Sequence, residues 1–429
     1  MSEAVPRRPE LVRDSSWLAS SDVLAILLGL VGQAFLAKSL LRSDFGLMIV
    51  VIDAFVVMFL LVDAGLPTII TRDVPRAPSQ CRSLVMQTFR IQAILAAIMA
   101  PIGFIIALKL WPDASLLLLG ASGGIAILHV FTYAPRSALR ALGEARKEAI
   151  VKLVERVSVT FGYGFLTFRD DGDPAHYAMV FFLGVAASLL YAIIAGAKLW
   201  STSQEQAITK EEKNILLSNK ALLLSALPFA ITLGVIPLIG RLEKLLLSWY
   251  HSTEEVAVFH VAFLAYMAGL TLPQAIRAAM LPILGELRGN KIATIAEIRK
   301  ARRIILWLIP IGLVGGAIVV NLLMLLAFGD YIKESFPLFL ILLIGWVFTM
   351  LSAPNYVAVQ AGKQPWNFTL MLFIGVGLAA VSAVILIPTY GVLGAAISSV
   401  CGAITLAITA LIFSGEFSSN INDNHINEE

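Results

Sequence analysis

The chain has 429 residues, of which 58% are hydrophobic and only 14% are charged, and its formal net charge is +3 at pH 7. Soluble domains carry about 25% charged residues, so this composition and a mean hydropathy of +0.84 exclude a soluble globular protein and indicate a membrane protein. The two cysteines, Cys81 and Cys401, predict neither a disulfide framework nor a metal site.

A transmembrane helix needs about 20 apolar residues to cross a hydrocarbon core of about 30 Å. The N-terminal stretch "MSEAVPRRPELVRDSS" is polar, and no small-residue cleavage site follows it, so we expect the first span to be retained. The hydropathy pattern predicts an all-α polytopic membrane protein. Its twelve transmembrane helices are predicted at residues 16–40, 47–70, 84–108, 116–135, 150–168, 176–197, 221–248, 256–284, 304–328, 338–361, 367–388 and 394–414.

Motifs for metal, nucleotide or covalent chemistry are absent from the sequence. The five histidines form no cluster with the spacing of metal ligands, and Gly362-Lys363 is followed by Gln364 where a Walker A loop needs Ser or Thr. We therefore expect no cofactor, no nucleic-acid partner and no ATP-driven step. An ion gradient, the membrane potential or trapping of the cargo on the outer side is expected to drive transport instead.

The distribution of basic residues predicts the orientation, because Lys and Arg resist translocation and accumulate on the cytoplasmic side. With the N-terminus inside, the predicted cytoplasmic segments hold 23 basic residues and the predicted outer segments hold five. Both termini and the loops at 136–156 and 285–303 are therefore predicted to be cytoplasmic. The five outer basic residues are Lys38, Arg42, Lys109, Arg169 and Lys333.

An internal repeat divides the predicted spans into two sets of six. "FLAKSLL" (35–41) aligns with "RLEKLLL" (241–247) at an offset of 206, and "APRSALRALG" (134–143) resembles "APNYVAVQAG" (353–362) at an offset of 219. Parallel repeats of this kind are related by an axis along the membrane normal, with the substrate path between them. The predicted organisation is an N-terminal six-helix bundle (1–200), a cytoplasmic linker (201–220), a C-terminal six-helix bundle (221–414) and a cytoplasmic tail (415–429).

Two stretches resemble a known family. "LAKSLLRSDFGLMIVVIDAFVVMFLLVDAGLPTIITRDVPR" resembles the signature of bacterial polysaccharide transporters, and "RLEKLLLSWYHSTEEVAVFHVA" is similar to their seventh span. That span usually reads Arg-Ile-Asp, and Glu243 keeps the charge here. The resemblance points to Wzx-type flippases of O-antigen or capsule repeat units, within the multidrug/oligosaccharidyl-lipid/polysaccharide (MOP) exporter superfamily.

The resemblance implies a fold and a cargo. The implied fold is two six-helix bundles related by a pseudo-two-fold axis along the membrane normal, with a V-shaped central cavity. The implied cargo is an undecaprenyl-pyrophosphate-linked oligosaccharide, turned by alternating access from the inner to the outer leaflet of the bacterial cytoplasmic (inner) membrane for O-antigen, lipopolysaccharide, capsule or exopolysaccharide synthesis. Polymerase and chain-length proteins of that pathway are the implied partners.

Four basic residues remain after the predicted cytoplasmic and outer segments are counted and are assigned to the spans, namely Arg90, Arg241, Lys244 and Arg277. A charged residue at the bilayer centre costs roughly 2.5 to 3.5 kcal/mol on insertion scales, so such residues face a wet interior or pair with acids. We predict that they line a cationic cavity and bind a pyrophosphate, together with Lys38, which aligns with Lys244 in the repeat. The alternative is that these side chains snorkel to an interface.

Depth along the spans separates these cations. Arg90 and Arg277 lie about 10 to 12 Å inside the predicted cytoplasmic ends of their helices. They would serve the cytoplasmic half of the path, and Arg241 and Lys244 would serve the outer half. Arg241 and Lys244 share a helical face because they are three residues apart, whereas Glu243 is turned away from Arg241.

Three acidic residues are likewise assigned to the spans, namely Asp53, Asp63 and Glu243. Asp63 belongs to "DAGLP", where it either accepts hydrogen bonds at a helix end or acts in transport. An acid as deep as Asp53 is expected to be protonated or matched with an arginine. All three are candidates for charge pairing or for coupling to H⁺ or Na⁺.

Two other function classes compete with a lipid-linked-sugar flippase. An ion-coupled drug exporter of the same superfamily favours acids in the cavity, but basic residues in the spans outnumber acids by four to three. A membrane polymerase or ligase of lipid-linked sugars needs a sizeable outer segment, and the predicted outer loops have about ten residues or fewer. The sequence therefore favours a transporter that is not an enzyme.

Overall fold

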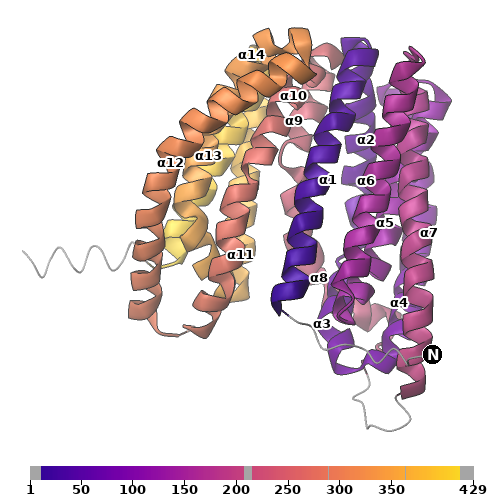
Figure 1. Ribbon diagram of the computed structural model, residues 1–429, viewed down its shortest axis with the longest axis vertical. Coiled ribbons are helices and arrows are strands. Elements are labelled where there is room, and N and C mark those ends of the chain that lie inside the picture. The colour runs from indigo at the N-terminus through magenta and orange to yellow at the C-terminus, as the bar shows by residue number, and fades with distance from the viewer. Residues whose placement is uncertain (1–10, 207–214, 288, 363, 416–429) are drawn as a thin grey trace, which may run out of the picture. The chain divides into compact units, whose positions relative to one another are not determined.

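The computed structural model describes residues 11–206, 215–287, 289–362 and 364–415, which form helices and turns without any strand (Figure 1). These residues divide into two compact units, 1–234 and 235–429. The first unit contains α1 (Leu11–Ser39), α2 (Arg42–Asp63), α3 (Leu66–Asp73), α4 (Cys81–Leu110), α5 (Leu116–Ala141), α6 (Ala145–Phe168), α7 (Pro174–Gln206) and all but the last residue of α8 (Asn219–Val235). The second contains α9 (Arg241–Tyr250), α10 (Thr253–Gly269), α11 (Thr271–Glu286), α12 (Lys291–Ala327), α13 (Ile332–Ala361) and α14 (Pro365–Phe413).

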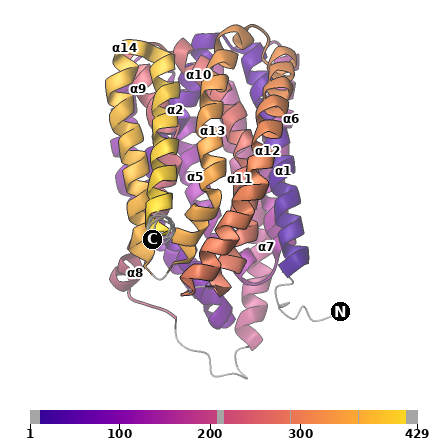
Figure 2. The same cartoon turned by 90° about the vertical axis from the view of Figure 1, so that its left-hand side faces the viewer.

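The helices account for the twelve predicted spans. In the described part of the chain, nine helical stretches are long and apolar enough to cross a membrane, and a tenth is interrupted between Asn219–Thr232 and Ile236–Tyr250. α6 adds a crossing of 24 residues whose first turns are charged. α14 has 49 residues and bends back at Gly391, so its two arms make two crossings (Figure 2). The predicted all-α polytopic fold is confirmed.

Gly391 breaks α14 because its backbone has φ 52° and ψ −130°, a region that favours glycine. A Cβ atom at this position would lie 2.5 Å from Oε2 of Glu255. The same carboxylate oxygen accepts a hydrogen bond from the Val392 N–H at 3.2 Å, and Nε2 of His251 donates to the carbonyl of Ile387 at 2.7 Å. Glu255 at the start of α10 and His251 after the end of α9 thus form hydrogen bonds with backbone groups that the break leaves without helical partners.

The turn between α2 and α3 also depends on a glycine. Gly65 has φ +67°, and a Cβ atom there would lie 2.4 Å from the backbone nitrogen of Ala230, so only glycine lets α8 approach this closely. Asp63 Oδ2 accepts a hydrogen bond from the Gly65 N–H at 3.3 Å. The helix-end role considered for Asp63 is therefore present in the structure.

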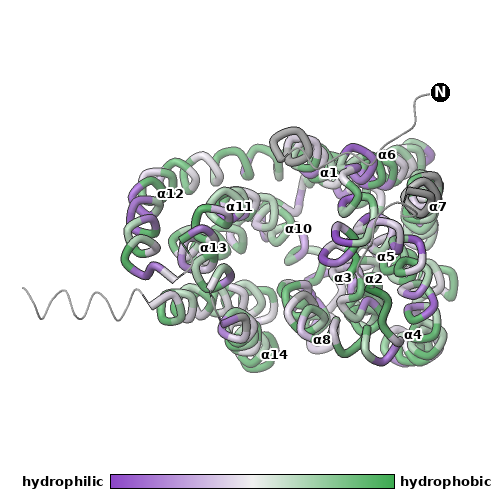
Figure 3. The backbone as a smooth tube through the Cα atoms, turned by 90° about the horizontal axis from the view of Figure 1, so that it is seen from below, coloured by the Kyte–Doolittle hydropathy of each residue, from purple (hydrophilic) through white to green (hydrophobic). Residues whose placement is uncertain are grey.

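Each unit has a buried core and an apolar exterior. In the first unit, Leu66, Ile69 and Ile70 of α3 pack with buried residues of α4, α5, α7 and α8. On α12 of the second unit, Trp307 and Leu326 are 79% and 74% exposed, as expected of side chains that face lipid. Hydrophobic residues predominate along the helices of both units (Figure 3), which agrees with a multi-pass membrane protein.

The packing changes from one unit to the other inside the predicted seventh span. Leu222 and Ala226 of α8 belong to the core of the first unit, whereas Leu247 of α9 is buried in the second. The two units therefore meet in sequence at Gly234, within the predicted span 221–248. The predicted domain boundaries remain a prediction, and residues 207–214 of the linker and 416–429 of the C-terminal tail lie outside the described residues.

Candidate substrate-binding residues

Glu243 lies in the first turn of α9 and is only 2% exposed. Gly240, with φ +75°, ends the preceding turn, and its N–H donates to Glu243 Oε2 at 2.9 Å. The other carboxylate oxygen, Oε1, accepts a hydrogen bond at 3.0 Å from Ser399 Oγ on the second arm of α14. Glu243 therefore caps α9 and links it to α14, which is a charge-stabilised structural joint.

Lys244 is also buried, with 5% exposure, although it lies in a predicted transmembrane segment. Its Nζ atom is 3.4 Å from Nδ1 of His260, which is 7% exposed on α10. A neutral imidazole nitrogen accepts a hydrogen bond from an ammonium group. The pair places an amine and an imidazole next to the Glu243 joint, and the sequence pattern alone did not suggest His260.

Arg241 is half-buried at the first position of α9. Its Nη1 atom donates to the carbonyl of Pro237 at 2.7 Å, so the guanidinium stabilises the backbone break that precedes α9. Lys244, three residues further on, is more deeply buried than Arg241.

Arg277 lies on α11, where its guanidinium carbon is 3.9 Å from the centre of the Tyr356 ring on α13. Tyr356 in turn makes an edge-to-face contact with Phe368 of α14, with ring centroids 5.1 Å apart. The Nε atom of Arg277 is buried and has no hydrogen-bond partner among the described residues. The aromatic face of Tyr356 fixes the position of the guanidinium, and the buried Nε donor is left without an acceptor in the part of the chain that the structure describes.

Tyr266 of α10 interacts electrostatically with both Glu243 and Arg277. Its buried ring contacts Phe263 at a centroid distance of 5.6 Å, and its hydroxyl lies within electrostatic reach of both Arg277 and Glu243. The second unit thus contains three of the predicted cations (Arg241, Lys244 and Arg277), one carboxylate (Glu243) and several aromatic rings. Charge and aromatic surface therefore occur together on α9, α10 and α11.

The remaining predicted residues lie in the first unit. Lys38 is exposed in the last turn of α1, and Asp53 is buried on α2 with 8% exposure. Oδ1 of Asp63 has no hydrogen-bond partner within the described residues. Arg90 is exposed on α4 and lines a groove with Arg82. Among the residues described for this unit, these predicted residues form no ion pair with one another.

An ion-pair network in the first unit was not predicted. Glu148 at the start of α6 is fully buried and bonds to Arg140 of α5, with an Arg140 Nε to Glu148 Oε2 distance of 2.8 Å. One turn earlier, Arg136 Nη2 lies 3.7 Å from the same carboxylate. Deeper in the unit, His129 Nε2 is 3.4 Å from Glu155 Oε2. The signal was present in the sequence, since Arg136 and Arg140 are four residues apart and share a helical face.

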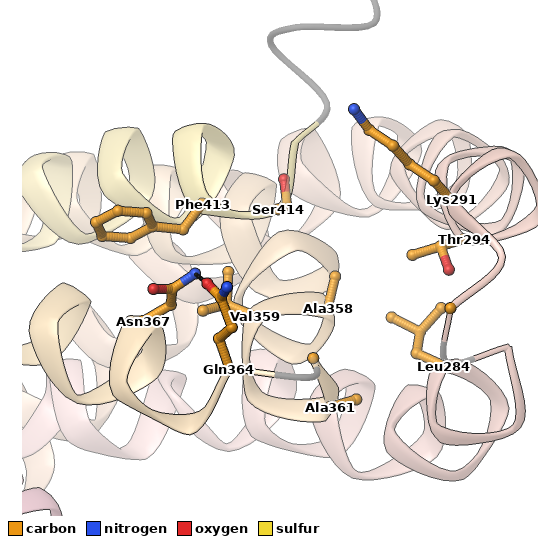
Figure 4. Close-up of a pocket in the computed structure, with 12 residues that line it drawn as sticks. Leu284, Lys291, Thr294, Ala358, Val359, Ala361, Gln364, Asn367, Phe413 and Ser414 are labelled. Atoms are coloured by element: carbon orange, nitrogen blue, oxygen red, sulfur yellow. Dashed lines mark hydrogen bonds between the residues drawn. The ribbon is translucent and has the colours of Figure 1, made fainter.

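A pocket of about 280 Å³ opens in the second unit where α13 ends and α14 begins (Figure 4). Asn367 Nδ2 donates to Gln364 Oε1 at 3.0 Å on its polar side. Lys291 of α12, Ser414 and the apolar Val359 also line it. The pocket is mostly neutral, and no group of three metal-binding side chains occurs in the residues described.

Comparison with known families decides the classification of the chain. The family model described as "Polysaccharide biosynthesis protein" matches residues 11–288. The chain belongs to this polysaccharide biosynthesis protein family. The resemblance of the two quoted stretches to polysaccharide transporters is thereby confirmed, whereas no curated protein matches the sequence.

Solved structures of this fold are similar over nearly the whole length. An inward-facing multidrug resistance MATE family transporter of the MOP superfamily matches with a TM-score of 0.66 and 15% identity, covering 93% of this chain and 96% of that one. The lipid II flippase MurJ, in an inward closed conformation, matches with a TM-score of 0.66 and 11% identity, covering 92% and 86%. A MOP superfamily transporter from Pyrococcus furiosus reaches 0.66 at 15% identity and 96% coverage of both chains. The protein therefore has the MOP superfamily fold.

Proposed function

We propose that this protein is a flippase that moves undecaprenyl-pyrophosphate-linked oligosaccharide repeat units from the inner to the outer leaflet of a bacterial cytoplasmic membrane. Membership of the polysaccharide biosynthesis protein family supports the pathway. The fold shared with a lipid II flippase supports transport of a lipid-linked sugar. The fold alone does not separate this cargo from a drug, because a multidrug transporter matches equally well.

The observation that carries the proposal is the environment of Arg277. A guanidinium in a membrane segment is costly unless it pairs or faces water. Arg277 stacks on Tyr356 and has no acidic partner among the described residues, and its buried Nε donor is unsatisfied. A diphosphate supplies oxygen acceptors that match the bidentate geometry of a guanidinium. A cationic drug would be repelled by the guanidinium, so this environment favours an anionic cargo.

The other predicted residues have supporting roles in this proposal. Lys244, whose Nζ atom is 3.4 Å from Nδ1 of His260, adds a second cation. Arg241 is proposed to release its hydrogen bond to Pro237 when it contacts the headgroup, and Lys38 supplies a further cation. Asp53, Asp63 and Glu243 remain our candidates for charge pairing or for coupling to H⁺ or Na⁺. Both termini are proposed to be cytoplasmic.

Complementation tests the proposal in cells. In a strain lacking the gene, Arg277→Ala is expected to abolish or strongly reduce surface polysaccharide while the protein remains in the membrane at the normal amount. Arg277→Lys keeps the charge but loses the bidentate donors of the guanidinium, and it is expected to retain partial function. Arg169→Ala is the control, because Arg169 stacks on Phe165 outside the proposed site. Full complementation by Arg277→Ala would refute an anion-binding role for this residue.

A further inference from the structure

The chain segment before α8 lies against the start of α4 and is fixed there by two glutamines. Nε2 of Gln87 donates to the Leu217 carbonyl at 2.7 Å and to Asn219 Oδ1 at 2.8 Å. Oε1 of Gln80 accepts a hydrogen bond from the Ile215 N–H at 3.0 Å. These contacts form the wall of a groove of about 490 Å³ on the first unit.

Two arginines of α4 also line this groove. Arg82, Met86 and Arg90 are spaced four residues apart on α4, so they form one stripe about 12 Å long. Both guanidinium groups are exposed, and no acidic side chain lines the groove. Within the residues that the structure describes, neither arginine forms an ion pair or a hydrogen bond. Two cations therefore face one groove without a counter-charge.

The groove also presents apolar side chains to the exterior. Met86, Leu216 and Leu217 are 36%, 39% and 41% exposed and line it together with the arginines. The stripe lies on a candidate membrane span, Pro78–Leu110. Paired cations beside exposed apolar surface on a span match a ligand with a charged phosphate and apolar chains. The predicted orientation places the start of α4 in the cytoplasmic leaflet, which is rich in anionic lipid.

We propose that this groove binds an anionic phospholipid. Arg82 and Arg90 donate charge-assisted hydrogen bonds to the phosphate oxygens, and the acyl chains follow Met86 and the two leucines. The bound lipid contacts both α4 and the segment leading into α8, so it stabilises the attachment of α8 to the first unit. This assignment separates Arg90 from the cations that bind the transported headgroup, and it does not depend on Arg277.

Native mass spectrometry of the full-length protein in detergent, titrated with phosphatidylglycerol, tests this site. The double variant Arg82→Gln/Arg90→Gln is expected to bind phosphatidylglycerol about 10- to 100-fold more weakly, because each charge-assisted hydrogen bond is lost. Lys300→Gln/Arg303→Gln removes two exposed cations from α12 and is expected to bind as the unchanged protein does. Arg82→Lys/Arg90→Lys keeps both charges and is expected to lose less affinity than the glutamine pair. It also provides a test if the glutamine variant does not fold.

Phosphatidylcholine and undecaprenyl pyrophosphate are the comparison ligands. Phosphatidylcholine is expected to bind the unchanged protein at least tenfold more weakly than phosphatidylglycerol, because it carries no net charge. Undecaprenyl pyrophosphate is expected to bind the glutamine pair as well as it binds the unchanged protein. Equal affinity of the glutamine pair and the unchanged protein for phosphatidylglycerol would overturn the assignment. Loss of undecaprenyl pyrophosphate binding in the glutamine pair would instead make the lipid-linked donor the occupant, and the proposal would be wrong.

Discussion

The junction between α5 and α6 in the first unit and the junction between α13 and α14 in the second occupy corresponding positions in the repeat. At an offset of 219 residues, Ala134-Pro135 aligns with Ala353-Pro354. Arg140 and Glu148 then align with Val359 and Asn367. The first junction is closed by the buried Arg140–Glu148 ion pair, whereas the neutral pair in the second lines the 280 Å³ pocket.

The same kind of junction between two helices can therefore contain either an ion pair, as between α5 and α6, or an open pocket, as between α13 and α14. In the second unit, Asn355 lies one helical turn before Val359 and forms hydrogen bonds with residues of neighbouring segments. Arg302 Nη2 donates to Asn355 Oδ1 at 2.7 Å, and Asn355 Nδ2 donates to Ser414 Oγ at 2.8 Å. These bonds connect α12 and α13 to the residue after α14, and they leave the pocket open.

The other ends of the same helices differ as well. At the same offset, Gly172 between α6 and α7 aligns with Gly391 in the break of α14. In the first unit, His176 Nδ1 lies 2.8 Å from Asp171 Oδ2 in an exposed turn. In the second unit, His251 and Glu255 come from outside α14 and bond to its broken backbone. In the first unit the turn is stabilised by residues of the turn itself and the start of α7, whereas in the second the break is stabilised by side chains from outside α14.

The largest predicted effect comes from breaking the ion pair of the first junction. Glu148→Leu leaves Arg140 and Arg136 without their carboxylate, and breaking a buried pair typically costs about 3 to 5 kcal/mol of unfolding free energy. We expect about 3 kcal/mol, the lower end, because the Arg140 side chain is 48% exposed. Denaturant unfolding in detergent measures this loss. Asn367→Leu is the matched control, with an expected change of about 0.5 kcal/mol or less.

A smaller effect on stability is predicted for the hydrogen bonds of Glu243 that link α9 to α14. Ser399→Ala removes one hydrogen bond to Glu243, so we expect a loss of about 1 to 2 kcal/mol of unfolding free energy. Glu243→Ala also removes the cap at Gly240 and is expected to cost more. Equal effects of the two substitutions would mean that the cap contributes nothing.

Transplanting the first junction into the second sharpens the comparison further. Val359→Arg/Asn367→Glu places the first unit's pair at the corresponding positions of the pocket. We expect a loss of about 1 kcal/mol of unfolding free energy, because Val359 is only 4% exposed and the larger arginine side chain must be accommodated beside the pocket. We also expect slower reaction of a thiol reagent with Ala361→Cys, because the new pair fills the pocket. Unchanged labelling would show that the pocket does not close.

The smallest effect concerns the exposed turn of the first unit. Burial raises the pKa of Asp171 slightly, but hydrogen bonds from the Asp173 N–H and the His176 ring outweigh it and hold that pKa below its usual value. The stabilisation is therefore present above the unfolded-state pKa of about 3.9 and is lost as the pH falls through the lower folded-state pKa. Asp171→Asn is expected to cost about 0.5 kcal/mol or less at pH 6. The difference between variant and original should shrink as the pH falls below about 3.9, and a cost that does not change with pH would exclude an ionic origin.

The fold class and the number of spans followed from the sequence because apolar length is a local property. The helix-end role of Asp63 was also readable, since its partner Gly65 is two residues away. Long-range partners were not readable. Glu243 and Ser399 are separated by 156 residues, and only the packing of α9 on α14 brings them together.

The sequence places these cations in apolar segments, but their environments depend on tertiary contacts. Nothing near Arg277 in the sequence predicts the Tyr356 ring, because that ring comes from α13. Glu148 falls in a segment predicted as a charged cytoplasmic loop, yet it is fully buried because α5 supplies its arginines. Charge counts gave the orientation prediction, and they could not distinguish an exposed basic residue from half of a buried pair.

Transport by the purified protein tests the central claim most directly. The protein is reconstituted into vesicles with a fluorescent undecaprenyl-pyrophosphate-linked oligosaccharide, and the fraction of label exposed on the opposite leaflet is followed in time. We expect flipping by the unchanged protein, little or no flipping by Arg277→Ala, and partial activity of Arg277→Lys. Flipping by Arg277→Ala at the unchanged rate, or none by the unchanged protein under an imposed ion gradient, would contradict the proposed function.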